Sequence, residues 1–228
     1  MKFLHILLLF TISSFAETYI SGSVINNSVI GDNNFKNRGS GVIVSKNIST
    51  SSFNKIDIDI PARIDINRAE ERSILLKTDN NLINKIKIYV KGTTLFIRTK
   101  GSFQSTKDIK IVINNPNLKS LIVDGASTIN IDGYKEKSIS IIVDGSTDIY
   151  FKSGNFNTLS LKADGSYDIN LLNIEIKNAK IRAEGAGDIK VNVSNYLDID
   201  LEGSVDVKYS GNPKLKKRVK DVADLTHI

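Results

Sequence analysis

A short pattern recurs five times between Leu121 and Tyr209, and this repetition constrains the fold more than any other feature of the sequence. Each copy has alternating apolar residues, then an acidic residue, a glycine and a small residue, and then alternating apolar residues again. The glycines are Gly125, Gly145, Gly165, Gly185 and Gly203. They are 20 residues apart three times and 18 residues apart once. A fixed period of about 20 residues is typical of a solenoid.

The apolar positions of each repeat predict strands rather than helices. They lie two and four residues before the glycine and four and six residues after it, and most are β-branched. Such alternation indicates a strand with one buried face. Two topologies fit: antiparallel hairpins, or a parallel β-helix whose equivalent strands stack about 4.8 Å apart. The β-helix places like residues on like, so the uniform columns favour an all-β parallel β-helix with coils of about 20 residues.

Acidic residues occupy two outward positions that flank the glycines, with Thr128 after Gly125 as the one exception. These positions lie one residue before and three residues after it, and they include Asp144, Asp148, Asp164, Asp168, Glu184 and Asp188. One hypothesis is a ridge that binds a ligand or a cation, with calcium favoured because it takes oxygen ligands. The alternative is turn chemistry, because Asp before Gly is a common turn pair. The dense nonapeptide pattern of calcium-binding β-rolls is absent, so no metal site is predicted.

Residues 1–16 have the pattern of a secretory signal peptide. Lys2 precedes a largely apolar stretch, and Ser14-Phe15-Ala16 fits a small-residue cleavage site. The alternative is an uncleaved N-terminal anchor. No later stretch has the ~18 apolar residues of a membrane-spanning helix, so none is expected after cleavage. The sequence has no cysteine, which excludes disulfides. Export to the periplasm, the cell surface or the medium is therefore predicted.

The remaining segments flank the repeats. Residues 17–48 are rich in Asn, Ser and Gly, and we expect a polar segment or a first cap. The β-helix is expected over 49–212, with the regular repeats at 121–209 and a hairpin turning at Gly92. Residues 213–228 form a basic C-terminal tail or cap, for which the spacing of the apolar residues suggests a short amphipathic helix. That helix would present Leu215, Val219, Val222 and Leu225 on one side.

Composition argues against catalysis. The only histidine outside the signal peptide is His227, and there is no cysteine, so nucleophilic triads and histidine-based zinc sites are unavailable. We therefore predict no catalytic residues. One enzyme class remains as the alternative, a polysaccharide lyase or hydrolase that uses acidic residues and calcium on a β-helix. Its residues would be Asp144, Asp164, Asp168, Asp188, Arg182 and Lys162. The regularity of the columns disfavours it, because active sites usually interrupt a repeat.

The chain resembles the head GIN domain family of auto-transporter adhesins over roughly residues 49–212. The resembling pieces are Phe53 to Ile56, Asn81-Leu82, Gly92 to Ile97, Pro116 with Leu118 and Leu121, the glycine repeats, and Gly211 to Pro213. The resemblance implies an exported, right-handed parallel β-helix that has no assigned biochemical role. The acidic turns depart from the plain Gly-Ser pattern of that family.

The predicted function is an exported, non-enzymatic β-solenoid that serves as an adhesin-like binding or structural module at the bacterial envelope. Its expected partners are an envelope glycan, another protein or further copies of itself. No cofactor is expected apart from calcium in the ridge hypothesis. Nucleic acid is not expected as a partner, although the formal net charge is +6, because aromatic residues are not interleaved with the lysines.

Overall fold

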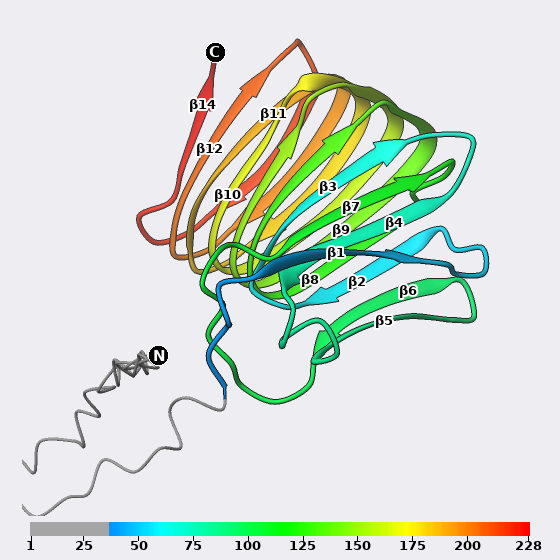
Figure 1. The fold of residues 1–228 in the computed structure, drawn as a ribbon. Coiled ribbons are helices and arrows are strands. Elements are labelled where there is room, and N and C mark those ends of the chain that lie inside the picture. Colours follow the sequence, from blue (N-terminus) through cyan, green and yellow to red (C-terminus); the bar gives the residue numbers. More distant parts are fainter. Residues whose placement is uncertain (1–36) are drawn as a thin grey trace, which may run out of the picture. The chain divides into compact units, whose positions relative to one another are not determined.

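The computed structural model describes residues 37–228, which form a β-solenoid of about five turns without any helix in that range (Figure 1). The strands are β1 (Ile43–Ile48), β2 (Lys55–Asp59), β3 (Ala62–Arg68), β4 (Ser73–Asp79), β5 (Ile86–Lys91), β6 (Thr94–Thr99), β7 (Lys110–Asn115), β8 (Ser120–Asp132), β9 (Tyr134–Phe151), β10 (Gly154–Ala183), β11 (Ala186–Leu201), β12 (Ser204–Ser210), β13 (Lys214–Val219) and β14 (Asp224–His227). The predicted signal peptide, 1–16, and the start of the polar segment lie outside the described residues.

The repeats stack in parallel and in register. Gly125 of β8 lies opposite Gly145 of β9, and Gly145 lies opposite Gly165 of β10. Residues of the same type therefore face each other from coil to coil, and the prediction of a parallel β-helix rather than a meander is confirmed.

The glycine corner explains why the repeat is so strict. Gly145 has a φ of 122°, which residues with side chains rarely adopt. A β-carbon there would lie 2.7 Å from the carbonyl oxygen of Gly125 in the coil below. The close approach of the backbones at this corner therefore requires glycine in successive coils.

The corner separates two faces of the solenoid, which we name by their strands. The first face precedes the glycine and contains β5, β6, β2, the first parts of β8 and β9, and then β10, β11 and β13. The second face follows the glycine, with strand order β1-β4-β7-β3-β8-β9-β10-β11-β12-β14. On both faces alternate side chains point outward, as predicted.

The interior is filled by apolar side chains from every coil. Ile, Leu and Val stack in columns, and the largest buried side chains are Tyr134, Phe151 and Phe156. Phe151 and Phe156 meet edge to face with their ring centroids 5.9 Å apart. Because each fully buried aliphatic side chain contributes roughly 1.5–3 kcal/mol, this continuous core is the main source of stability.

The N-terminal coils are less regular than the repeats. β5 and β6 form the hairpin predicted at Gly92, which confirms that expectation. β4 is inserted antiparallel between β1 and β7. At the end of β4, the buried Asp79 accepts hydrogen bonds from Ser105, Thr106 and the Gly41 N–H. Burial opposes ionisation of Asp79, but these hydrogen bonds outweigh it and lower its pKa to about 2.

The C-terminal segment differs from the helix suggested by the sequence. Residues 214–219 form β13, which pairs in parallel with β11, and β14 pairs in parallel with β12. The helix prediction was therefore wrong. Leu215 lies opposite Leu197, at the 18-residue step of the last repeat, so stacking on the coil below overrides the helical spacing of the apolar residues.

Candidate binding surfaces

The six acidic residues proposed for the ridge fall into two columns on either side of the glycine corner. Asp144 lies opposite Asp164, and Glu184 follows them in the next coil on the first face. On the second face, Asp148 lies opposite Asp168, which in turn lies opposite Asp188. The six are Asp144, Asp148, Asp164, Asp168, Glu184 and Asp188. The structure thus stacks them in two columns, one on each face.

The carboxylates do not converge on a point. Among residues 37–228 no group of three or more acidic or histidine side chains is arranged to hold a metal ion. Asp168 is the most constrained, because its Oδ2 accepts a hydrogen bond of 3.2 Å from the Tyr150 hydroxyl, whereas its buried Oδ1 has no partner. Cation binding by the ridge stays a prediction.

The acidic column of the second face continues into a much longer ladder. Ten strands contribute one outward residue each, and neighbouring residues are register partners. We call this series the charge ladder, and in spatial order it is Ser45, Lys77, Lys110, Arg63, Thr128, Asp148, Asp168, Asp188, Asp206 and Asp224. It changes sign along its length, with three basic residues followed by a threonine and five acidic residues.

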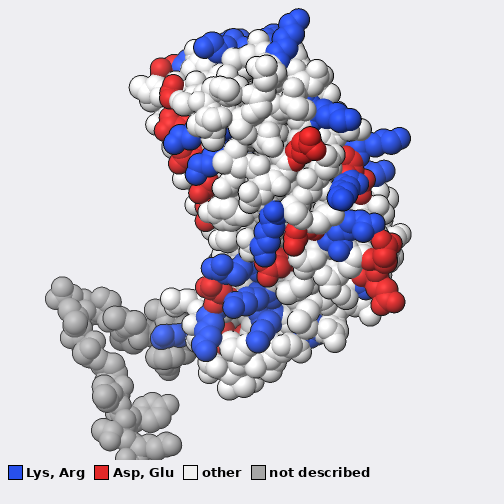
Figure 2. All heavy atoms as spheres, turned by 90° about the horizontal axis from the view of Figure 1, so that it is seen from above, with Lys and Arg blue, Asp and Glu red and all other residues white. Residues whose placement is uncertain are grey.

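The acidic half of the charge ladder is unusual because no salt bridge between residues 37 and 228 reaches any of its five aspartates. Neighbouring strands lie about 4.8 Å apart, where two like charges repel by about 1 kcal/mol in water and about 3 kcal/mol at an effective dielectric of 20. Figure 2 shows acidic atoms in a line along one edge of the molecule, interrupted by a few Lys or Arg atoms, with more Lys and Arg atoms gathered below it.

Two grooves lie beside the basic half of the charge ladder. One, of about 550 Å³, is lined by Ile43, Lys77, Lys107, Asp108 and Lys110. The other, of about 360 Å³, includes Arg63, Asp108, Thr128 and Asp148 in its lining. Both include Asp108, which lies 3.8 Å from the Arg63 guanidinium in an exposed ion pair. The second face is therefore hollowed where its charge changes sign.

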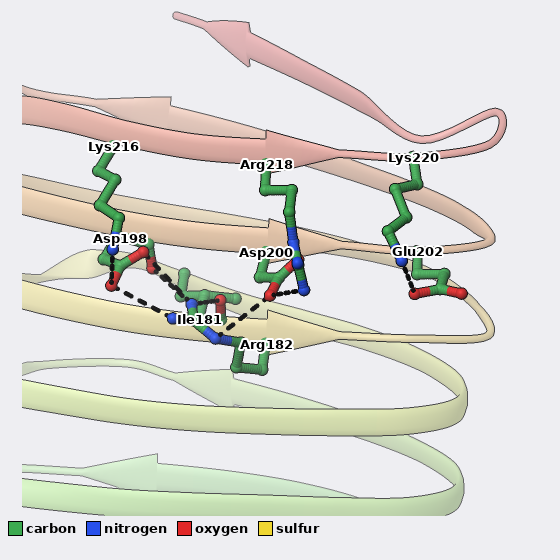
Figure 3. A network of polar contacts seen from close by, with 8 residues as sticks. All are labelled: Ile181, Arg182, Asp198, Asp200, Glu202, Lys216, Arg218 and Lys220. Carbon is green, nitrogen blue, oxygen red and sulfur yellow. Dashed lines mark hydrogen bonds and ion pairs between the residues drawn. The ribbon is translucent and has the colours of Figure 1, made fainter.

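On the first face, the C-terminal coils carry opposite charges in alternate strands (Figure 3). We call these residues the paired rows; they are Arg182, Asp198, Asp200, Glu202, Lys216, Arg218 and Lys220. Both nitrogens of the Arg218 fork donate to the Asp200 carboxylate at 2.7 Å. Arg182 donates to Asp198 at 3.2 Å, and Lys220 donates to Glu202 at 2.9 Å. Charges here are neutralised within the solenoid.

The cations of the paired rows lower the pKa of their aspartates. For Asp198, burial opposes ionisation, but the Arg182 hydrogen bond and nearby cations lower the pKa overall. For Asp200, the hydrogen bond from Arg218 is the main cause of the lowered pKa. Arg182 is thus engaged by Asp198 and Asp200, and this weakens the lyase hypothesis, which needed it beside the acidic columns.

The N-terminal end of the first face carries an aromatic platform, formed by Tyr89, Phe96 and Arg98. Tyr89 is 47% exposed and stacks on Phe96 with ring centroids 5.4 Å apart. The Arg98 guanidinium lies 5.4 Å from the Phe96 ring centre and 2.7 Å from Asp57. Lys87 and Lys91 flank Tyr89 on the same outward side of β5.

Sequence reasoning missed the charge ladder and the aromatic platform. The ladder joins Lys77, Lys110 and Arg63, which have no common repeat position. The platform had one available signal, since the hairpin at Gly92 places Tyr89 opposite Phe96 once its register is fixed. Alternation then puts both rings on the outward side.

The fold defines the class of the molecule, a parallel β-solenoid. The chain belongs to the family described as "Putative auto-transporter adhesin, head GIN domain", whose model matches residues 52–213. The resemblance inferred from the motifs is thereby confirmed.

Solved structures share the fold. A putative adhesin from Bacteroides fragilis is 20% identical with a TM-score of 0.71, covering 84% of this chain and 99% of its own. Putative adhesins from Parabacteroides merdae and Parabacteroides distasonis are 17% and 18% identical, each with a TM-score of 0.53. Each match covers 84% of this chain, and they cover 98% and 99% of those chains, respectively. A comparison with curated proteins found no match.

Proposed function

We propose that the protein is an exported, adhesin-like module of the bacterial envelope that holds an acidic glycan on its outer surface without altering it. The observation that carries this proposal is the aromatic platform. Among the Phe and Tyr residues of the range 37–228, only Tyr89 is exposed, at 47%, and it lies between two lysines on the outward side of β5.

The chemistry of the platform suits a sugar with a carboxylate. A flat aromatic ring offers an apolar surface to the C–H face of a sugar, and its rigid side chain loses little entropy on binding. Lys87 and Lys91 supply positive charge on either side of the ring, within reach of acidic groups on neighbouring sugars.

Holding rather than cleaving fits the arrangement of the acidic side chains. The acidic side chains form columns along the solenoid. Arg182, the cation that the lyase hypothesis requires, forms ion pairs with Asp198 and Asp200 instead. Incubation with the glycan should leave its chain length unchanged. Shortening that a chelator prevents would instead support the polysaccharide lyase or hydrolase.

The test is a titration calorimetry comparison of alginate, an acidic polysaccharide, with dextran, a neutral one. We expect alginate to bind and Tyr89→Ala to weaken it at least tenfold, because the stacking surface is lost. Lys87→Ala with Lys91→Ala should remove the preference for alginate. Tyr150→Ala on the second face is the matched control and should bind like the parent. Equal binding by Tyr89→Ala would disprove the role of the platform.

Export is part of the proposal and has its own test. The segment 1–16 supplies the predicted signal, and the family of adhesins supports an exported or surface protein. Between residues 37 and 228 no helix is both long and apolar enough to cross a membrane. N-terminal sequencing of the chain recovered from the periplasm or surface should begin at Glu17. Retention of Met1 in the cytoplasm would reject this part of the proposal.

A further inference from the structure

The charge ladder is self-complementary about its own centre. Its ten strands divide evenly between β8 and β9, with the three basic residues in one half and all five aspartates in the other half. Reversing the order of the ladder places positive charge where negative charge was, and no position meets its own sign.

We propose that a second copy of this chain packs on the second face, related to the first by a two-fold axis that runs along the strands between β8 and β9. Such an axis reverses the ladder while keeping each outward column above its equivalent. The facing residues would be Ser45 with Asp224, Lys77 with Asp206, Lys110 with Asp188, Arg63 with Asp168, and Thr128 with Asp148.

The neighbouring outward column supports the same arrangement. It contains Asn47, Leu75, Val112, Asp65, Asn130, Tyr150, Asn170, Lys190, Lys208 and Thr226 in spatial order. Under the same axis Leu75 meets Lys208, Val112 meets Lys190, and Asp65 meets Asn170. No like charges face each other, and the lysine stems can cover the two half-buried apolar side chains.

The size of the second face is sufficient. Ten strands about 4.8 Å apart span roughly 43 Å, and six residues of β8 beyond the corner extend about 20 Å. The product is roughly 850 Å² for each copy, close to the about 800 Å² that a standard interface buries on each partner. The partner also explains why the five aspartates have no ion pair among residues 37–228, since the basic half of the other copy would supply their cations.

This inference goes beyond the proposed glycan binding, because it uses the other face and needs no external ligand. The two can therefore fail separately: loss of the dimer leaves the aromatic platform on the first face intact.

The test is sedimentation analysis of the full chain at low salt, using two charge-reversed variants. One carries Lys77→Glu and Lys110→Glu, and the other carries Asp188→Lys and Asp206→Lys. We expect the parent to dimerise at low salt and to dissociate in 0.5 M salt, since salt screens the attraction between the ladder charges that are exposed on the separate copies. Each variant alone should be monomeric, because like charges then face each other.

An equal mixture of the two variants should restore a dimer, since every reversed residue then meets a reversed partner. This rescue also shows that both variants fold. The matched control reverses Asp144→Lys and Asp164→Lys, two stacked aspartates of earlier coils on the first face, and it should dimerise like the parent. A monomeric parent, or a dimer indifferent to both reversals, would overturn the proposal. A monomer that binds a polycation or polyanion through the ladder would assign the face to another partner and overturn it equally.

Discussion

The paired rows and the charge ladder are built on the same coils, yet they treat charge in opposite ways. In the paired rows, Asp200 has a cation in the coil below and another in the coil above, and the aspartate is neutralised inside the chain. In the charge ladder, Asp188 has an aspartate on both sides. The comparison teaches that stacking like on like does not force a like-charged surface. In the paired rows, acidic and basic residues alternate from coil to coil and attract each other. In the acidic half of the charge ladder, aspartates stack on aspartates and repel each other.

The largest expected difference comes from reversing one charge in each region. Arg182→Glu would place a third carboxylate beside Asp198 and Asp200, and we expect a loss of about 2 kcal/mol in the free energy of unfolding. Asp188→Lys in the charge ladder replaces repulsion with attraction and should be neutral or stabilising. Urea unfolding of both variants, at a protein concentration low enough to keep the chain monomeric, measures this difference in the free energy of unfolding. Equal losses would show that the two regions do not differ.

A milder pair of changes should give effects of opposite sign. Asp198→Asn removes the negative charge that faces Arg182 and Lys216, and it should lower the free energy of unfolding by about 1 kcal/mol. Asp168→Asn removes one carboxylate between two others and should raise it by up to about 1 kcal/mol, provided that the amide keeps the Tyr150 hydrogen bond. Chemical unfolding at low salt, at a protein concentration low enough to keep the chain monomeric, is the measurement, and a loss in both variants would contradict the expectation.

Acid should weaken the paired rows. The folded-state pKa of Asp198 and Asp200 lies below the ordinary value of 3.8, so their stabilisation is complete above that value. It is lost as the pH falls through the lower folded-state pKa, because the unfolded chain then binds protons more readily. Melting temperatures measured from pH 6 to pH 2 should fall less steeply in Asp198→Asn than in the parent. An unchanged slope would count against the pairing.

The smallest effect is expected from calcium. The carboxylates of the ridge stand in file, so millimolar calcium should raise the melting temperature only by general screening, as magnesium does. Thermal unfolding with each ion, before and after chelation, provides the measurement. A shift of several degrees that only calcium produces, and that Asp164→Asn or Asp168→Asn abolishes, would establish a cation site instead.

Much of the fold could be predicted because equivalent positions of successive repeats are register partners. Once Gly125 and Gly145 mark the same corner, alternation fixes which side chains are buried and which columns point outward. The same logic placed all six acidic residues of the ridge. This reasoning applies to residues 121–209, where equivalent positions are one coil apart in the sequence.

The position of β4 and the C-terminal strands could not be predicted, because they depend on strand pairings that do not follow from the repeat. β4 enters antiparallel between β1 and β7, so Lys77 joins the ladder through contacts across more than thirty residues of sequence. At the C-terminal end, Leu215 and Val219 have a spacing that suits a helix. They form a strand because β13 pairs with β11 in the coil below. In both cases tertiary contacts, rather than local sequence, determine the result.

The glycine corner also limits how the gene for such a protein can change in length. Deleting one residue within 121–209 would move every later side chain to the wrong side of the sheet and put a side chain against the backbone at the corner. Deleting or duplicating one whole coil would leave every column matched. Descendants of this sequence should therefore gain and lose length by entire coils. The position of the duplicated coil determines how many residues each charged column contains.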